Sequence, residues 1–154
     1  DLAMHGHNFF ELAYIAGGTA EHTLETEVKT ISAGDYFIVD YGCLHGFQNC
    51  KNLTLINCLF LPETVDETLQ GCRSFSQLLQ GCLLKYYRMS LGKAKLARVF
   101  HDRNGQVGRM QEMLLEYQEQ KVGCYPLLRL KLLEILLLTL RGMIELEIDR
   151  PYST

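Results

Sequence analysis

The sequence predicts an α+β protein in which a small β barrel or sandwich is followed by a helical half. Residues 1–61 contain short segments with the two-residue apolar period of strands, separated by turn residues. After Pro62 the apolar residues recur every three or four positions, which is typical of helices. We therefore expect residues 1–61 to form the β region and residues 62–154 the helical region.

The individual elements follow from where each period begins and ends. The segments expected as strands are 9–14, 19–24, 28–31, 36–39, 45–48 and 53–61, and those expected as helices are 77–88, 93–101, 106–120 and 126–147. Gly17-Gly18 interrupts the first strand run as a turn would, and 49–52 separates the last two strands. Pro62 suits the first turn of a helix, and Val122-Gly123 marks the break before the last helix.

The composition is that of a globular protein. Of the 154 residues, 47% are hydrophobic and 21% are charged, which excludes disordered and low-complexity classes. The net charge is −3, whereas compact domains that bind nucleic acids are usually strongly basic. The six cysteines form no Cys-x-x-Cys pair, and the sequence shows neither a signal peptide nor an apolar run that spans a bilayer. We therefore expect a cytoplasmic protein with reduced thiols and no membrane partner.

Four potential metal ligands lie in the β region. His5, His7 and Glu11 occupy odd positions of the strand-like N-terminal segment, so we expect their side chains on one face. Two imidazoles two residues apart can chelate one ion, and the carboxylate reaches it where the strand curves inward. His45 is the candidate for a fourth ligand from a neighbouring strand. His22 we interpret as a strand or pocket residue rather than a ligand.

The spacing of these residues resembles the two motifs of the cupin superfamily. The matching residues are His5, His7, Glu11 and Gly18 in the first motif, and Gly34, Gly42, His45 and Asn49 in the second, where Asp40 replaces a proline. The resemblance implies a cupin-like jelly-roll barrel (a double-stranded β-helix). It also implies that the three imidazoles and the carboxylate hold a divalent ion such as Zn, Ni, Fe or Mn. The alternative is that the same four side chains line a pocket without a metal.

The last expected helix, about 126–147, has more apolar surface than one domain needs. One apolar stripe has the alternating three- and four-residue spacing of a helix-on-helix seam, and a second apolar face accompanies it. The stripe comprises Leu130, Leu133, Leu137, Leu140 and Ile144, and the second face Leu128, Leu132, Ile135, Leu136 and Met143. We expect a homodimer through this helix. The alternative is a central helix buried within a single domain.

A barrel followed by such helices resembles the N-terminal sensing and dimerisation domain of AraC-type transcription regulators. The resemblance rests on HGHNFFELAYIAGG, GDYFIVDYGCLHGF, LINCLFLPE and YPLLRLKLLEILLLTLRG. It implies a small-molecule effector in the barrel. It also implies DNA binding through a separate C-terminal helix-turn-helix domain, which we expect to be absent because too little sequence follows Pro151. The candidate effector-binding residues are Phe9, His22, Tyr36 and Tyr41, with core packing as the alternative role of Phe9.

Two other functions stay open from the sequence alone. The first is a metal-dependent cupin enzyme, such as an oxygenase or isomerase, in which open positions on the ion bind substrate. The long helical half argues against it, and no separate general acid or base is evident once Glu11 binds the ion. The second is an interaction module with a vestigial pocket. We therefore predict an effector-sensing domain rather than an enzyme.

Overall fold

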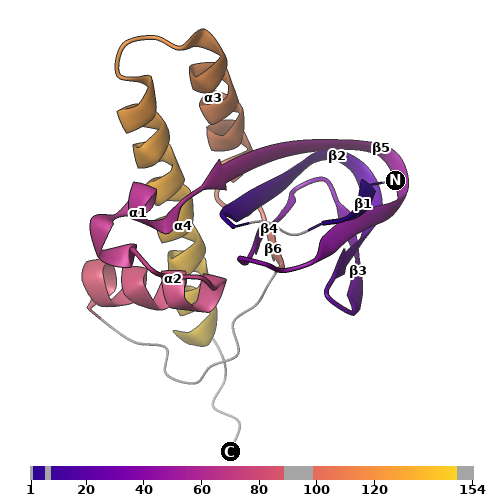
Figure 1. The fold of residues 1–154 in the computed structure, drawn as a ribbon, viewed down its shortest axis with the longest axis horizontal. Helices are drawn as coiled ribbons and strands as arrows, with labels where there is room; N and C mark the ends of the chain where they lie inside the picture. The colour runs from indigo at the N-terminus through magenta and orange to yellow at the C-terminus, as the bar shows by residue number, and fades with distance from the viewer. Residues whose placement is uncertain (1, 6–7, 89–98, 149–154) are drawn as a thin grey trace, which may run out of the picture.

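The computed structural model describes residues 2–5, 8–88 and 99–148, and it shows a curled antiparallel sheet beside a group of helices (Figure 1). The strands are β1 (Leu2–His5), β2 (Phe10–Leu24), β3 (Glu27–Ser32), β4 (Asp35–Val39), β5 (His45–Phe60) and β6 (Val99–His101). The helices are α1 (Pro62–Val65), α2 (Phe75–Cys82), α3 (Gln106–Glu119) and α4 (Cys124–Ile148), with a 3₁₀ turn at Glu67–Leu69 and a π-helical turn at Leu83–Tyr87. The predicted class, a barrel-like β region followed by helices, is confirmed as a half-barrel.

The two long strands β2 and β5 pair along their whole length and give the sheet its curl. The sheet order is β1-β5-β2-β4-β6, and β3 pairs with the second half of β2. Register shifts between Ile15 and Glu21 mark β-bulges, which bend a strand and increase its twist. The turn expected at Gly17-Gly18 is therefore wrong, because these residues form the bend inside one continuous strand. The break expected at 49–52 is likewise inside β5, where Asn49 and Asn52 adopt positive φ angles.

Two further expectations differ from the structure. Residues 99–101, expected in a helix, form β6 and pair with β4, where Phe100 packs against Tyr36 and Phe75. The expected helical region therefore contributes a strand to the sheet. The N-terminal segment is not one strand either, since β1 ends at His5 and bends at residues 8 and 9 precede β2. The rest of the helix expected at 93–101 lies outside the described residues.

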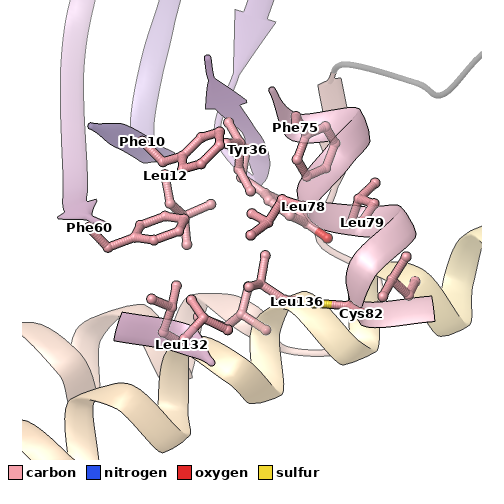
Figure 2. Packing of buried hydrophobic residues seen from close by; sticks show 14 of the residues in the cluster. Phe10, Leu12, Tyr36, Phe60, Phe75, Leu78, Leu79, Cys82, Leu132 and Leu136 are labelled. Atoms are coloured by element: carbon pink, nitrogen blue, oxygen red, sulfur yellow. The ribbon is translucent and has the colours of Figure 1, made fainter. Parts of the chain in front are cut away.

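The alternation of side chains along the strands creates two separate cores. The inner face of the curled sheet holds one cluster, which includes Ala13, Ile15, Ala20, Ile31, Phe37, Val39 and Phe47. The outer face, with Leu12 and Tyr36 among its residues, packs against α2 and α4 in a larger cluster (Figure 2). Each of β2 and β4 therefore contributes alternate residues to both cores, as the two-residue period of a strand requires.

The helices α3 and α4 form an antiparallel hairpin, with Gly123 at the break before α4. Arg109 pairs with Glu134, and Lys131 pairs with Glu112 at 3.0 Å, across the two helices. Of the predicted stripe, Leu140 is buried in the outer core, whereas Leu137 is half-buried and Leu130 is 54% exposed. The alternative of a helix buried wholly in its own domain is therefore wrong.

All six cysteines are free thiols. Among the helices that the structure describes, none combines the length and the apolar character that crossing a membrane requires.

Candidate functional site

Three buried polar side chains meet on the inner face of the sheet. His45 Nε2 lies 3.0 Å from Glu11 Oε2, and His45 Nδ1 lies 3.2 Å from His22 Nε2. The three side chains are only 1–6% exposed. Glu11 and His22 lie in the two halves of β2, and an eleven-residue separation would place them on opposite faces of a regular strand. The bulges around Gly17 change this alternation, so both side chains reach His45 at the start of β5.

The environment of His22 keeps its imidazole uncharged. Its ring stacks on Phe37 with a centroid distance of 4.1 Å and contacts Phe47 at 4.9 Å. Burial, and after it the nearby His45, lower the pKa of His22 to about 4, although Glu11 acts in the opposite direction. At neutral pH the inner face therefore presents the neutral imidazole of His22 in contact with His45, which in turn contacts the carboxyl group of Glu11.

The structure brings together two of the four predicted metal ligands, Glu11 and His45. The backbone register also places His5 of β1 opposite His45 of β5. His7 lies outside the described residues, as does the side chain of His5. Within the described part of the chain, no group of three or more His, Cys, Asp or Glu side chains has an arrangement that could hold a metal ion. A four-ligand metal centre therefore stays a prediction that depends on His5 and His7.

The predicted effector-binding residues divide between the two faces of the sheet. His22 lies on the inner face, whereas Tyr36 belongs to the outer core that packs on the helices. Tyr41 also packs against the outer core, with its ring 5.0 Å from that of Phe10. Phe9 is half-buried at the bend before β2. Of these four, the structure places His22 beside Glu11 and His45, and Tyr36 and Tyr41 against the outer core.

A small cavity opens at the inner face of the sheet. A cavity of about 10 Å³ lies beside His22 and Phe37, with Leu24, Glu27, Lys29 and Val99 as its other lining residues. This is close to the smallest volume that holds one water molecule. Small-molecule sites usually occupy roughly 300–1,000 Å³. An effector that binds in this cavity would therefore have to displace the side chains that line it.

A much larger groove, about 430 Å³, lies between the end of β5 and the α3–α4 hairpin. Residues 56–60 of β5 and Thr64 of α1 form one side. The helices contribute one face each, with Met110, Met113, Leu114 and Tyr117 from α3 and Tyr125, Leu128, Arg129 and Leu132 from α4. Both sets follow the i, i+3, i+4, i+7 pattern of a single helix face. These residues cannot be distinguished from an ordinary core face by sequence, because the groove depends on how the hairpin is placed against β5.

Buried polar contacts connect the outer face of the sheet to the helices. Tyr36 Oη lies 2.8 Å from Thr139 Oγ1 of α4, and Gln106 Nε2 of α3 donates to Tyr36 Oη at 3.4 Å. Tyr14 donates its hydroxyl proton to Asp102 at 2.7 Å. Asp102 also accepts from the backbone N–H of Gln106 and of Val107, at the start of α3. Strands β2 and β4 are therefore joined directly to the beginning of α3 and the middle of α4.

Comparison with known protein families identifies the fold. The family model for the AraC-like ligand binding domain matches residues 1–118. The chain belongs to the AraC-like ligand-binding domain family. The predicted resemblance to the N-terminal sensing domain of an AraC-type regulator is confirmed. A search of curated proteins finds no match.

The family match covers the whole half-barrel and nearly all of α3, but it ends before α4. In this AraC-like domain the inner-face residues Glu11, His22 and His45 all lie within the matched region. The sequence predicts Glu11 and His45 as ligands of one metal and His22 as a separate pocket residue, because the contact of His22 with His45 depends on the bulges in β2. Thr139, which joins α4 to the sheet, was also missed, since one threonine in an apolar helix gives no signal of its partner.

Proposed function

We propose that this AraC-like domain is the effector-sensing and dimerisation domain of a transcription regulator. A small molecule binds at the inner face beside His22, His45 and Glu11, and this changes how α4 positions an attached helix-turn-helix domain on DNA. The observation that supports the proposal is the arrangement of β4. Phe37 stacks on His22 on the inner face, and its neighbour Tyr36 contacts Thr139 of α4 on the outer face.

The proposed coupling follows from the small inner cavity. Because that cavity is only about 10 Å³, a ligand of metabolite size moves the Phe37 ring and with it the β4 backbone. Tyr36 then moves relative to Thr139, so the free and bound states differ in their contact with α4. A ligand shifts such an equilibrium by the difference in its affinity for the two states.

A thermal-shift screen of small polar metabolites tests the sensing proposal. A ligand that binds the native domain raises its unfolding free energy by about 2.7 kcal/mol at a hundredfold excess over Kd. We expect His22→Ala to lose this stabilisation and Val28→Ala, on exposed β3, to keep it. Stabilisation that survives His22→Ala would place the effector elsewhere. Catalytic turnover that stops on chelation would favour the metal-dependent enzyme instead.

We propose that the stripe of α4 forms a two-fold dimer. Leu130 is 54% exposed, and Leu137 and Ile144 are half-buried on the same side of the helix. Leu130→Glu and Leu137→Glu should both yield monomers in light scattering. Val28→Glu is the matched control, because it places the same charge at an exposed apolar residue of β3. A dimer that persists in both α4 variants would remove this interface.

A divalent metal at His5, His7, Glu11 and His45 is a further proposal for the inner face. It is supported by the 3.0 Å approach of Glu11 to His45 and by the register of His5 opposite His45. Imidazole and carboxylate donors suit Zn, Ni, Fe and Mn. Elemental analysis of the purified chain should show about one equivalent of metal, which His45→Ala removes. Metal-free protein with an unchanged melting temperature after chelation would contradict it.

A further inference from the structure

We propose that the groove between β5 and the α3–α4 hairpin is a second ligand site, separate from the inner face, and that it takes an apolar carboxylate. The inference rests on the lining of the groove and does not require an effector at His22.

The groove has the shape of a ligand site. Its floor is formed by buried side chains, with Phe60, Met110 and Leu132 exposed by 6%, 1% and 2%. Its rim is formed by exposed ones, and Leu114 and Tyr125 are 42% and 66% exposed. The volume of about 430 Å³ lies within the range of small-molecule sites. A ligand seated there would cover apolar surface that is otherwise in contact with water.

The lining favours a ligand whose main part is apolar. It is mostly aliphatic, aromatic and sulfur-containing, and Met110 and Met113 lie side by side on α3. Methionine side chains are unbranched and flexible, so they adapt to irregular apolar shapes. The uncharged polar groups in the lining are few, chiefly Asn57, Thr64 and the two tyrosine hydroxyls.

The lining also favours a ligand with a negative charge. Arg129 is the single charged residue among the described residues that line the groove. Its guanidinium makes no ion pair with any described acidic side chain. A guanidinium presents two parallel N–H donors that match the two oxygens of a carboxylate. Arg129 therefore favours an anionic head group and disfavours a cationic one.

A small ligand fits the groove better than a second copy of the chain. The groove residues Leu128 and Leu132 and the stripe residues Leu130 and Leu137 lie on different sides of α4, because residues two apart on a helix are separated by about 200°. Leu130 is the exposed residue of the stripe, on the side of α4 away from Leu128 and Leu132, whereas the groove has a buried floor.

Isothermal titration of the full 154-residue chain with decanoate and with decanol tests the proposal, because the two probes share a chain length and differ in charge. We expect decanoate to bind at least tenfold more tightly than decanol. Arg129→Gln should abolish this difference. Arg141→Gln is the matched control, since it removes an exposed arginine three turns further along α4 and should keep it. Leu114→Trp, at the exposed rim, should weaken both probes by filling the groove.

Several outcomes would overturn the proposal. Equal binding of the two probes to the wild-type chain removes the selection for a carboxylate. Decanoate binding that is unchanged in both Arg129→Gln and Leu114→Trp places the ligand elsewhere. Arg129 is exposed, so its variant remains informative if circular dichroism shows that Leu114→Trp is misfolded. If the chain self-associates and Leu114→Trp abolishes this self-association, the groove is the contact surface for a second copy of the chain.

Discussion

Thr139→Val removes one hydroxyl from the contact between the sheet and α4 and changes little else. The Thr139 hydroxyl lies 2.8 Å from Tyr36 Oη and donates to the Ile135 carbonyl at 2.8 Å, while both Thr139 and Tyr36 are at most 5% exposed. In the variant, Tyr36 keeps only the longer contact with Gln106 at 3.4 Å. The Ile135 carbonyl retains its helical backbone hydrogen bond.

The size of the effect follows from this partial loss. A lost hydrogen bond costs about 1 kcal/mol, and a buried hydroxyl left without a partner costs up to about 3 kcal/mol, so we expect roughly 1–2 kcal/mol here. For a domain of this length that corresponds to a fall of roughly 2–8 °C in Tm. Thr139→Ser is the control that keeps the hydroxyl and loses one methyl group.

A double-mutant cycle in urea separates the contact from other effects. Tyr36→Phe removes the opposite hydroxyl, and Thr139 can still bond to Ile135 in that variant. If the two hydroxyls interact as the geometry indicates, their coupling energy is about 0.5–1.5 kcal/mol. Additive effects within about 0.3 kcal/mol would refute the direct contact. An unchanged stability of Thr139→Val would refute its burial as well.

Two other predictions concern β2 and the α1 region. Gly18→Ala should destabilise the fold far more than Gly17→Ala in urea denaturation. Gly18 has φ +77°, and a Cβ added there would lie 2.3 Å from the Asn52 carbonyl oxygen. A Cβ added at Gly17 would lie 3.6 Å from Thr54 Oγ1, which is an ordinary contact distance. Equal effects would contradict the bend at this site. Hydrogen bonds from Lys85, then Thr68 and Tyr86, hold the pKa of Asp66 well below its usual value. A lowered folded-state pKa stabilises the fold above the ordinary pKa of about 3.9, and this is lost as the pH falls through the lower value. Asp66→Asn should therefore weaken the acid dependence of stability below about pH 4, and an identical dependence in both proteins would contradict it.

The division of the sheet into two faces could be predicted where the strands are regular. Alternation in β4 separates Tyr36 and Ile38 from Phe37 and Val39, and the structure places these pairs in different cores. The alternation was lost at the bulges in β2, where an extra residue moves the following side chains to the other face. His22 is predicted as a pocket residue of the barrel, but its contact with His45 could not be predicted, because the alternation does not continue through the bulges.

Longer-range features depended on contacts that the sequence does not reveal. The local sequence of Val99–His101 does not exclude a helix. The segment becomes a strand because it pairs with the edge of β4, more than sixty residues earlier in the chain. The apolar arc of α4 was recognised from its periodicity. Which of its residues are buried, line the groove or, like Leu130, are exposed depended on the position of α3 and β5.

The position of β4 in the sheet makes it the strand best suited to transmit a change at the inner face. On one side it pairs with the long strand β2, and on the other, among the described residues, it pairs with the three-residue strand β6. β2 is held between β4 and β3 on one side and β5 on the other, so it resists displacement over its whole length. When Phe37 moves away from His22, the backbone of β4 therefore moves more readily than that of β2. Tyr36 is the adjacent residue on the opposite face, and Thr139 then follows it or loses its hydrogen bond. Either outcome alters α4 without any contact between the ligand and the helix.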